Sequence, residues 1–389
     1  MNIIDEAYQG AIKVLEHCAK PTGFYASGLP GGYEATWARD SMIASLGASL
    51  INDKFKNVFG KSLELLAKNQ SELGQIPNCV GSYNIERQSD ITFNSIDSTL
   101  WHFIGHHVYK NAYKDDVLFN KYLESRKRAL VWLKYQDPNE DGLLVQQPTM
   151  DWQDAFPHKY GRVLSTQALY YAALKLEGEE KKAEHIRRIV NGEVEKYLSL
   201  YDSKLGYYLP WSWKTHNKYR EEGKWFDTFG NLAAIITGLA APKIAKSILD
   251  FIEIEKIDKP YPCKAIYPPI KKGSKDWHDY FDDCEARKPY SYLNGGVWPF
   301  IGGFYVAALV KAGEYEKAEN VLKRLAEANK LAKPDLKNFG VGDQWGFYEW
   351  LDGKTGKISG GSSPYQAWSA GTYIWAYECL KRKSVLYFS

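Results

Sequence analysis

Apolar residues recur along most of this 389-residue chain with the spacing of an α-helix. A clear case is ENVLKRLAEANKLA, residues 319–332, in which Val321, Leu322 and Leu325 fall on one stripe. Alternation typical of strands is rare, although GYYLPWSW at 206–213 is compatible with a short one. The pattern predicts an all-α protein with helices over residues 3–20, 37–51, 54–69, 95–111, 115–135, 164–176, 178–200, 228–239, 242–252, 297–312, 314–332 and 364–382.

The connections between these helices alternate between short and long. Every second helix follows a long connection, and these helices recur at intervals of about 65 residues, which indicates a two-helix repeat present six times. An open solenoid is the alternative, but its repeats are shorter and have short links throughout. We therefore expect a closed toroid of six helical hairpins, an (α/α)6 barrel. It would form one domain over residues 1–389, with all the long connections at one mouth.

Most of the tryptophans fall where these long connections meet the helices that follow them. Large loops need aromatic anchors for packing, and packing explains some of these residues. Flat apolar rings beside polar groups also suit sugars, whose C–H faces stack on aromatic side chains. Ten of the 13 tryptophans are expected at the mouth, namely Trp37, Trp152, Trp211, Trp213, Trp225, Trp277, Trp298, Trp345, Trp350 and Trp368.

Composition excludes several classes of function. The 50 basic and 47 acidic residues leave a net charge of +3, with no basic patch for nucleic acid. The five cysteines form no CxxC pair, and no apolar run is long enough to span a membrane. The start of the chain has no basic segment followed by an apolar one, so a cytoplasmic protein is expected. Neither DPNEDG (137–142) nor HFIGHHV (102–108) has the spacing of a metal site, and no metal or cofactor is expected.

Charged residues stand at the start of two helices that follow long connections. Arg39 and Asp40 fall in the first turn after GGYEATW, and Asp97 falls in the first turn of FNSIDSTLW. Acids in a first turn are also favoured by the helix dipole, so a purely structural role is a reasonable alternative. At the mouth of a barrel, the same side chains would be placed to hold sugar hydroxyls.

Two further carboxylates lie beside tryptophans in the long connections. TMDWQDAFP (149–157) places Asp151 and Asp154 on either side of Trp152, and QWGFYEWLDGKTGK (344–357) places Glu349 beside Trp350. Cleavage of a glycosidic bond needs one carboxylic acid and one carboxylate. Burial beside an aromatic ring raises the pKa of a carboxyl, as a general acid requires. Asp154 and Glu349 are the best candidates for this pair.

Four segments carry a resemblance to known enzymes: WARDSMIA, WQDAF with GRVLSTQALYYAAL, NGGVWP, and YEWLDGKTGK with YQAWSAG. In the same order, they resemble the C-terminal amylo-α-1,6-glucosidase domain of glycogen debranching enzymes and the alkaline/neutral invertases. The resemblance implies an inverting (α/α)6-barrel glycosidase with Asp154 as general acid and Glu349 as general base. This chain has Ser165 where the relatives usually carry Glu. Residues expected to bind the substrate are Trp37, Arg39, Asp40, Asp97, Trp101, Asp151, Trp152, Gln167, Asn294, Trp298, Trp345, Gln366 and Trp368.

The expected function is an exo-acting α-glucosidase on oligosaccharides or branch stubs, with an oligosaccharide or disaccharide as substrate. Sucrose hydrolysis is the first alternative. A sugar epimerase or isomerase on the same barrel would use histidines as acid and base, and His158, His216 and His278 are the loop candidates. A sugar-binding protein without catalysis is the last alternative. The sequence leaves the oligomeric state open.

Overall fold

A computed structural model describes residues 2–30, 33–81, 89–216, 219–333 and 345–388. The prediction of a mostly helical fold is confirmed. None of the helices in these residues is long and apolar enough to cross a membrane. The helices are α1 (Ile3–Cys18), α2 (Ala38–Ala48), α3 (Lys56–Lys68), α4 (Ile96–Tyr113), α5 (Val117–Lys121), α6 (Leu123–Lys134), α7 (Leu164–Leu176), α8 (Glu180–Val190), α9 (Thr228–Thr237), α10 (Pro242–Ile254), α11 (Pro299–Lys311), α12 (Tyr315–Lys330) and α13 (Ala367–Arg382).

Two of the predicted helices differ from the observed ones. The helix expected over 115–135 is divided at Tyr122 into α5 and α6. The helix expected over 178–200 ends ten residues early, at Val190, because Gly192 takes a positive φ of 80° that a continuing helix excludes. The other predicted helices agree with the observed ones to within a few residues at each end.

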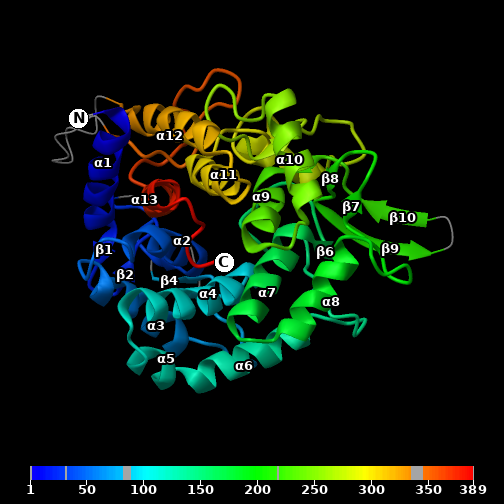
Figure 1. Cartoon of the computed structure of the whole chain (residues 1–389), viewed down its shortest axis with the longest axis horizontal. Coiled ribbons are helices and arrows are strands. Elements are labelled where there is room, and N and C mark those ends of the chain that lie inside the picture. Colours follow the sequence, from blue (N-terminus) through cyan, green and yellow to red (C-terminus); the bar gives the residue numbers. More distant parts are fainter. Residues whose placement is uncertain (1, 31–32, 82–88, 217–218, 334–344, 389) are drawn as a thin grey trace.

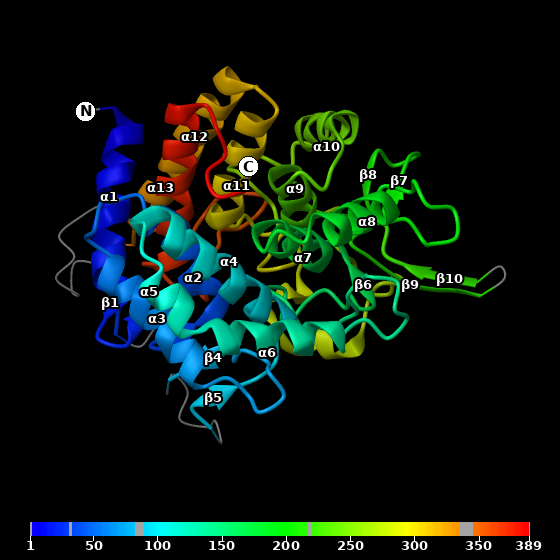
Figure 2. The same cartoon turned by 60° about the horizontal axis from the view of Figure 1, so that its bottom comes forward.

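Six of the helices form a closed sequence of contacts. Helix α2 packs on α4, α4 on α7, α7 on α9, α9 on α11, α11 on α13, and α13 packs back on α2. Figures 1 and 2 show α1, α3, α6, α8, α10 and α12 outside these six. Amphipathicity explains the two layers: α11 is buried from Pro299 to Val310, whereas α8 buries only the stripe of Ala183, Ile186, Ile189 and Val190.

Short antiparallel strands organise the long connections. Three of them, β3 (Thr36–Trp37), β6 (Arg162–Val163) and β11 (Phe226–Asp227), each run directly into an inner helix and thereby set where it begins. The stretch at 206–213 forms β8 (Tyr207–Tyr208) and the start of β9 (Trp211–His216). Strand β9 pairs with β10 (Tyr219–Glu222) in an arm that projects from the body (Figure 1). The remaining strands are β1 (Ala19–Lys20), β2 (Gly23–Phe24), β4 (Cys79–Val80), β5 (Ile91–Thr92), β7 (Tyr201–Asp202) and β12 (Ile266–Tyr267).

Glycines allow the first and last inner helices to approach closely. A Cβ atom on Gly47 of α2 would lie 2.0 Å from the carbonyl oxygen of Gly371 in α13. A Cβ on Gly371 would in turn lie 2.3 Å from the carbonyl oxygen of Ala44. Backbone packed against backbone leaves no flexible side chain to move aside, so this crossing depends on both glycines.

The Gly47→Ala variant tests whether this crossing limits stability. We expect the free energy of unfolding to fall by about 1–3 kcal/mol, because the added methyl group must separate α2 from α13. Gly360→Ala is the matched control, since nothing lies within 4 Å of a Cβ built at that glycine. Chemical denaturation of the two variants and the parent measures the difference. A Gly47→Ala variant as stable as the control would contradict the close crossing.

Candidate active site

A pocket opens where four of the long connections meet the first turns of the inner helices. Its open space, including the part that faces solvent, is ≈ 390 Å³. Because the two predicted catalytic carboxylates both border it, this pocket is the candidate active site. Its lining residues are Ala26, Tyr33, Trp37, Arg39, Asp40, Trp152, Asp154, Tyr292, Trp298, Glu349 and Trp368.

Of the two acids in TMDWQDAFP, only Asp154 lines the pocket. Asp151 is buried and faces the protein, where Lys159 Nζ lies 3.0 Å from its carboxylate and Gln146 donates to it at 3.1 Å. Lys159 also lies 3.5 Å from Asp227, the N-cap of α9. Asp151 therefore anchors the connection, and Asp154 is left 35% exposed at the pocket.

Arg39 forms ion pairs with three acids from different parts of the chain. Its guanidinium lies 3.2 Å from Asp97, 3.7 Å from Asp40 and 3.7 Å from Asp154. Burial opposes the charge on Arg39, but the three carboxylates raise its pKa above the ordinary value. Asp97 and Arg39 come from the first turns of α4 and α2, so this cluster joins two inner helices to the connection that carries Asp154.

Burial raises the pKa of Asp40 and of Asp154 to about 6, and Arg39 limits both rises. The negative charges of neighbouring carboxylates raise both pKa values further, in addition to the loss of hydration. Both groups therefore exchange protons near neutral pH, which is the range that acid–base chemistry in the cell requires.

Glu349 is the carboxyl with the larger pKa shift. Burial, together with the charges of Asp40 and Asp154, raises its pKa to about 8. Tyr33 donates a hydrogen bond of 3.5 Å to Glu349 Oε1. In this arrangement Glu349 keeps its proton to a higher pH than Asp154, which is the reverse of the predicted roles. A pH between these two values therefore favours a protonated Glu349 beside an ionised Asp154.

Tryptophans form the walls of the pocket. Trp152 meets Trp298 edge to face at 5.4 Å, and Trp368 stacks on Phe300 at 4.4 Å. Trp298 donates its indole N–H to the carbonyl of Tyr292 at 3.1 Å. These contacts hold the rings in fixed orientations and exclude water from the sides of the pocket. Of the ten tryptophans expected at the mouth, four line this pocket: Trp37, Trp152, Trp298 and Trp368.

Four other predicted substrate-binding residues lie outside the lining of this pocket and make contacts within the protein. Trp101 is fully buried in the ring, where it meets Phe304. Gln167 bonds both backbone groups of Leu144, at 2.7 and 3.1 Å. Trp345 packs against Gly10 of α1, outside the pocket. The fourth, Asn294, bonds both backbone groups of Ile270 and the carbonyl of Ala286 at 2.8–2.9 Å.

Two further predicted residues are buried and do not line the pocket themselves. Asp97 is buried and reaches the pocket only through Arg39. Gln366 is buried immediately before α13, and its amide nitrogen has no hydrogen-bond partner within the described chain. Ser165, which stands where relatives usually carry Glu, is also buried and outside the lining.

Three lining residues were absent from the sequence-based prediction: Ala26, Tyr33 and Tyr292. Tyr33 and Tyr292 lie four and six residues before lining tryptophans, so proximity to predicted residues was the available signal. Ala26 carries no chemical group that could have identified it. Its carbonyl accepts the backbone N–H of Ala367 at 2.9 Å, which brings the first connection onto the start of α13.

Of the three histidines that an epimerase would need, the two whose side chains the structure describes are not at this pocket. His158 and His278 stack on each other with ring centroids 3.9 Å apart, and neither lines it. The side chain of His216 lies outside the part of the chain that the structure describes. Among the described residues, no group of three or more His, Cys, Asp or Glu side chains could hold a metal ion.

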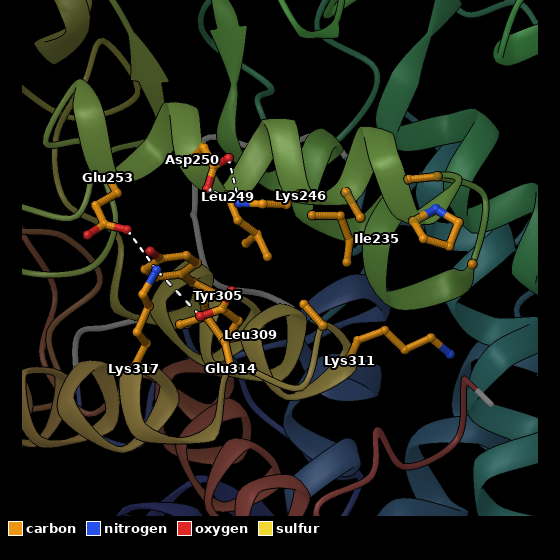
Figure 3. A pocket seen from close by; sticks show the side chains of 15 residues that line it. Ile235, Lys246, Leu249, Asp250, Glu253, Tyr305, Leu309, Lys311, Glu314 and Lys317 are labelled. Carbon is orange, nitrogen blue, oxygen red and sulfur yellow. Dashed lines mark hydrogen bonds and ion pairs between the residues drawn. The ribbon is translucent and has the colours of Figure 1, made fainter.

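A larger pocket lies between α9–α10 and α11–α12, near the ends of α9 and α11 (Figure 3). Its open space is ≈ 990 Å³. Figure 3 shows Lys317 between Glu253 and Glu314, and Lys246 beside Asp250. Its three carboxylates are thus paired with two lysines, and neither Asp154 nor Glu349 borders this pocket.

Curated relatives of this chain are plant invertases. A probable chloroplastic alkaline/neutral invertase A of Arabidopsis thaliana is 32% identical over 164 residues, which are 41% of this chain and 23% of the relative. Cytosolic invertase 1 of Oryza sativa subsp. japonica is 31% identical over 171 residues, 43% of this chain and 27% of the relative. The chain thus spans about a quarter of the length of these relatives.

Solved structures of similar fold are glycosidases. The GH63 mannosylglycerate hydrolase of Thermus thermophilus superposes with a TM-score of 0.67 at 14% identity, over 95% of this chain and 99% of that one. A rhamnosidase from Klebsiella oxytoca superposes with a TM-score of 0.63 at 14% identity, over 96% of this chain and 63% of that one. At such identities the likeness shows a shared fold, that of the six-hairpin glycosidases.

Two family models match successive parts of the chain. The amylo-alpha-1,6-glucosidase model matches residues 20–222, more than half of the chain, and this part carries Arg39, Asp40 and Asp154. The alkaline and neutral invertase model matches residues 217–383, and this part carries Glu349. The chain therefore belongs to the amylo-alpha-1,6-glucosidase family of glycoside hydrolases.

Proposed function

We propose that this protein is an inverting, exo-acting α-glucosidase built on a single (α/α)6 barrel. The observation that carries the proposal is the presence of Asp154 and Glu349 on one small pocket with aromatic walls. The closed sequence of contacts among the six inner helices supports the barrel. The limited space supports an enzyme that binds one terminal sugar and not the middle of a chain.

In the proposed reaction Asp154 donates its proton to the glycosidic oxygen as the bond from that oxygen to the anomeric carbon breaks. Glu349 accepts a proton from a water molecule, whose oxygen attacks the anomeric carbon from the opposite face. The leaving sugar departs as an alcohol, and the terminal sugar departs with inverted configuration. Glu349 then releases its proton to solvent, and Asp154 takes up a proton from solvent.

Substrate binding reverses the order of the two pKa values, so that Asp154 holds the proton as its proposed role requires. Asp154 is 35% exposed at the pocket, so a bound sugar removes water from it and raises its pKa. Glu349 is already buried, and a hydrogen bond from the attacking water to its carboxylate lowers its pKa. The single proton that the two groups share thereby moves to Asp154.

Arg39 and Asp40 are proposed to hold the hydroxyl groups of the terminal sugar. Both line the pocket beside Asp154, and together they offer donors and acceptors on one side of it. Asp97 acts through Arg39 by fixing the guanidinium at 3.2 Å. This arrangement places the polar edge of the sugar against α2 and leaves its apolar face to the tryptophans.

The two candidate substrates differ in the leaving group that is attached to the terminal glucose. The match over residues 20–222 favours a branch-stub or oligosaccharide substrate, as in amylo-α-1,6-glucosidases. The match over residues 217–383 and the invertase relatives favour sucrose. Sucrose is itself an α-glucoside, so glucose occupies the same pocket in both cases. We propose the oligosaccharide as the substrate, with sucrose as the second candidate.

Proton NMR of the first product tests the mechanism. Isomaltose, panose, a branched limit dextrin, maltose and sucrose are supplied in turn, and we expect β-glucose from whichever α-glucoside is cleaved. Asp154→Asn and Glu349→Gln are each expected to lower kcat by about 10²- to 10⁴-fold. α-Glucose as the first product would contradict inversion.

A substrate that needs no proton on its leaving group separates the two roles. Fluoride departs without protonation, so Asp154→Asn is expected to retain most of the parent's activity on α-glucosyl fluoride. Glu349→Gln is expected to lose activity on this substrate as well, because water still needs a base. The opposite pattern would exchange the roles of the two residues.

The pH dependence of kcat/KM follows from the two carboxyls. Below a pKa of about 6 both are protonated and the base is lost, whereas above about 8 both are ionised and the acid is lost. We expect a bell-shaped profile with its maximum between these values. A rate that keeps rising above pH 9 would contradict a carboxylic general acid.

The cost of burying Glu349 predicts a pH-dependent gain in stability for Glu349→Gln. Its pKa rises from 4.5 to about 8 on folding, so the folded state binds the proton more tightly and loses stability as pH rises through this range. At pH 9 the variant is expected to gain more than about 1 kcal/mol over the parent, with little gain at pH 4. Thermal unfolding measures this, with the exposed Glu319→Gln on α12 as control. An equal gain at both pH values would contradict the burial cost.

A further inference from the structure

A second cluster of rings lies outside the catalytic pocket. His158, Tyr160 and Trp211 line an open space of ≈ 790 Å³ together with His278, and Tyr280 adjoins them. We call these five residues the aromatic platform. Tyr160 lies on Trp211 at 4.6 Å, and His158 stacks on His278 at 3.9 Å. Tyr280 donates to or accepts from His158 Nδ1 at 2.9 Å and is 45% exposed.

The aromatic platform is joined to the catalytic pocket by one short segment. Asp154 and His158 are four residues apart, and Phe156 between them packs on Phe281 at 4.4 Å. Phe281 also contacts His278 at 5.6 Å. The platform is therefore continuous with the connection that carries the proposed general acid.

Asn294 holds the second half of the aromatic platform in place. Its side chain bonds Ile270 and Ala286, so it closes the loop that contains His278 and Tyr280. The same loop carries Glu285, whose charge contributes to the raised pKa of Glu349. Both proposed catalytic carboxylates thus neighbour segments that also build the platform.

Charged groups of both signs surround the rings of the aromatic platform. Arg220, Glu222, Lys275 and Asp276 line the same open space, and Arg220 pairs with Glu222. Tyr160 donates its hydroxyl to Glu221. The rings of His158, Tyr160, His278 and Tyr280 are partly exposed, whereas Trp211 is buried against Tyr160. Exposed ring surface with donors and acceptors at its edges matches a sugar, which presents apolar C–H faces and hydroxyl edges. Packing alone requires neither the exposed face of Tyr280 nor the open space.

We propose that the aromatic platform binds sugar units of the leaving group that lie beyond the unit at the bond that is cleaved. The substrate class is then a saccharide chain longer than a disaccharide. This inference rests on the proposed function, because it takes the catalytic pocket as the site of the terminal sugar. It favours the oligosaccharide over sucrose, since sucrose has no unit that extends to the platform.

Binding to the Asp154→Asn variant tests the aromatic platform without turnover. Calorimetric titration compares maltose with maltohexaose, and we expect tighter binding of the longer chain. Adding Tyr280→Ala or His278→Ala is expected to weaken maltohexaose binding by about 3- to 10-fold and to leave maltose unchanged, given the usual strength of ring stacking. Tyr135→Ala, at an 80% exposed tyrosine beyond α6, is the matched control and should change neither.

The outcomes separate this inference from the proposed function. Equal affinity for both chain lengths, or equal losses for both in the platform variants, would overturn the platform. Hydrolysis of maltose or sucrose by the parent protein under those conditions would leave the glycosidase proposal intact. Length-dependent binding through Tyr280 with no hydrolysis of any substrate would support the platform and overturn the proposed function.

Discussion

The candidate site depends on the positive charge of Arg39, which is buried among Asp40, Asp97 and Asp154. Carboxylates are costly to remove from water, and they repel one another when they are close. A guanidinium offers several donors in fixed directions, so it compensates more than one acid at once. With Arg39 in place, Asp40 and Asp154 remain close together at one small pocket, each with a pKa of about 6.

A second buried cation holds the connection that Arg39 contacts through Asp154. Lys159 binds Asp151 and Asp227, and so ties the connection that carries Asp154 to the start of α9. Inner helices supply the frame of the pocket: Arg39 and Asp40 lie in the first turn of α2, Trp368 lies in the first turn of α13, and Trp298 directly precedes α11. Loss of hydration at Glu349 raises its pKa and weakens the fold at high pH, so the proposed catalytic role has a cost in stability.

Much of the candidate site could be predicted from the order of the residues. Arg39, Asp40, Asp154 and Glu349 were identifiable because they are charged residues at a helix start or beside a tryptophan, in segments that resemble known glycosidases. Gln167 and Asn294 show where that reasoning ends. Both are polar residues beside predicted site segments, yet each bonds backbone groups of a loop. Sequence alone does not distinguish an amide that faces a ligand from one that faces a buried carbonyl, because both need the same side chain.

The sequence by itself determined most of the helices and the alternation of short and long connections between them, since these follow from local periodicity and connection length. It also identified the two catalytic candidates. Only the tertiary structure decided that Asp154 and not Asp151 borders the pocket, that Arg39 joins three acids, and that Trp211 lies apart from Trp152. These facts depend on contacts between residues far apart in the chain, and the direction of a side chain in a loop is set by the partners that folding brings to it.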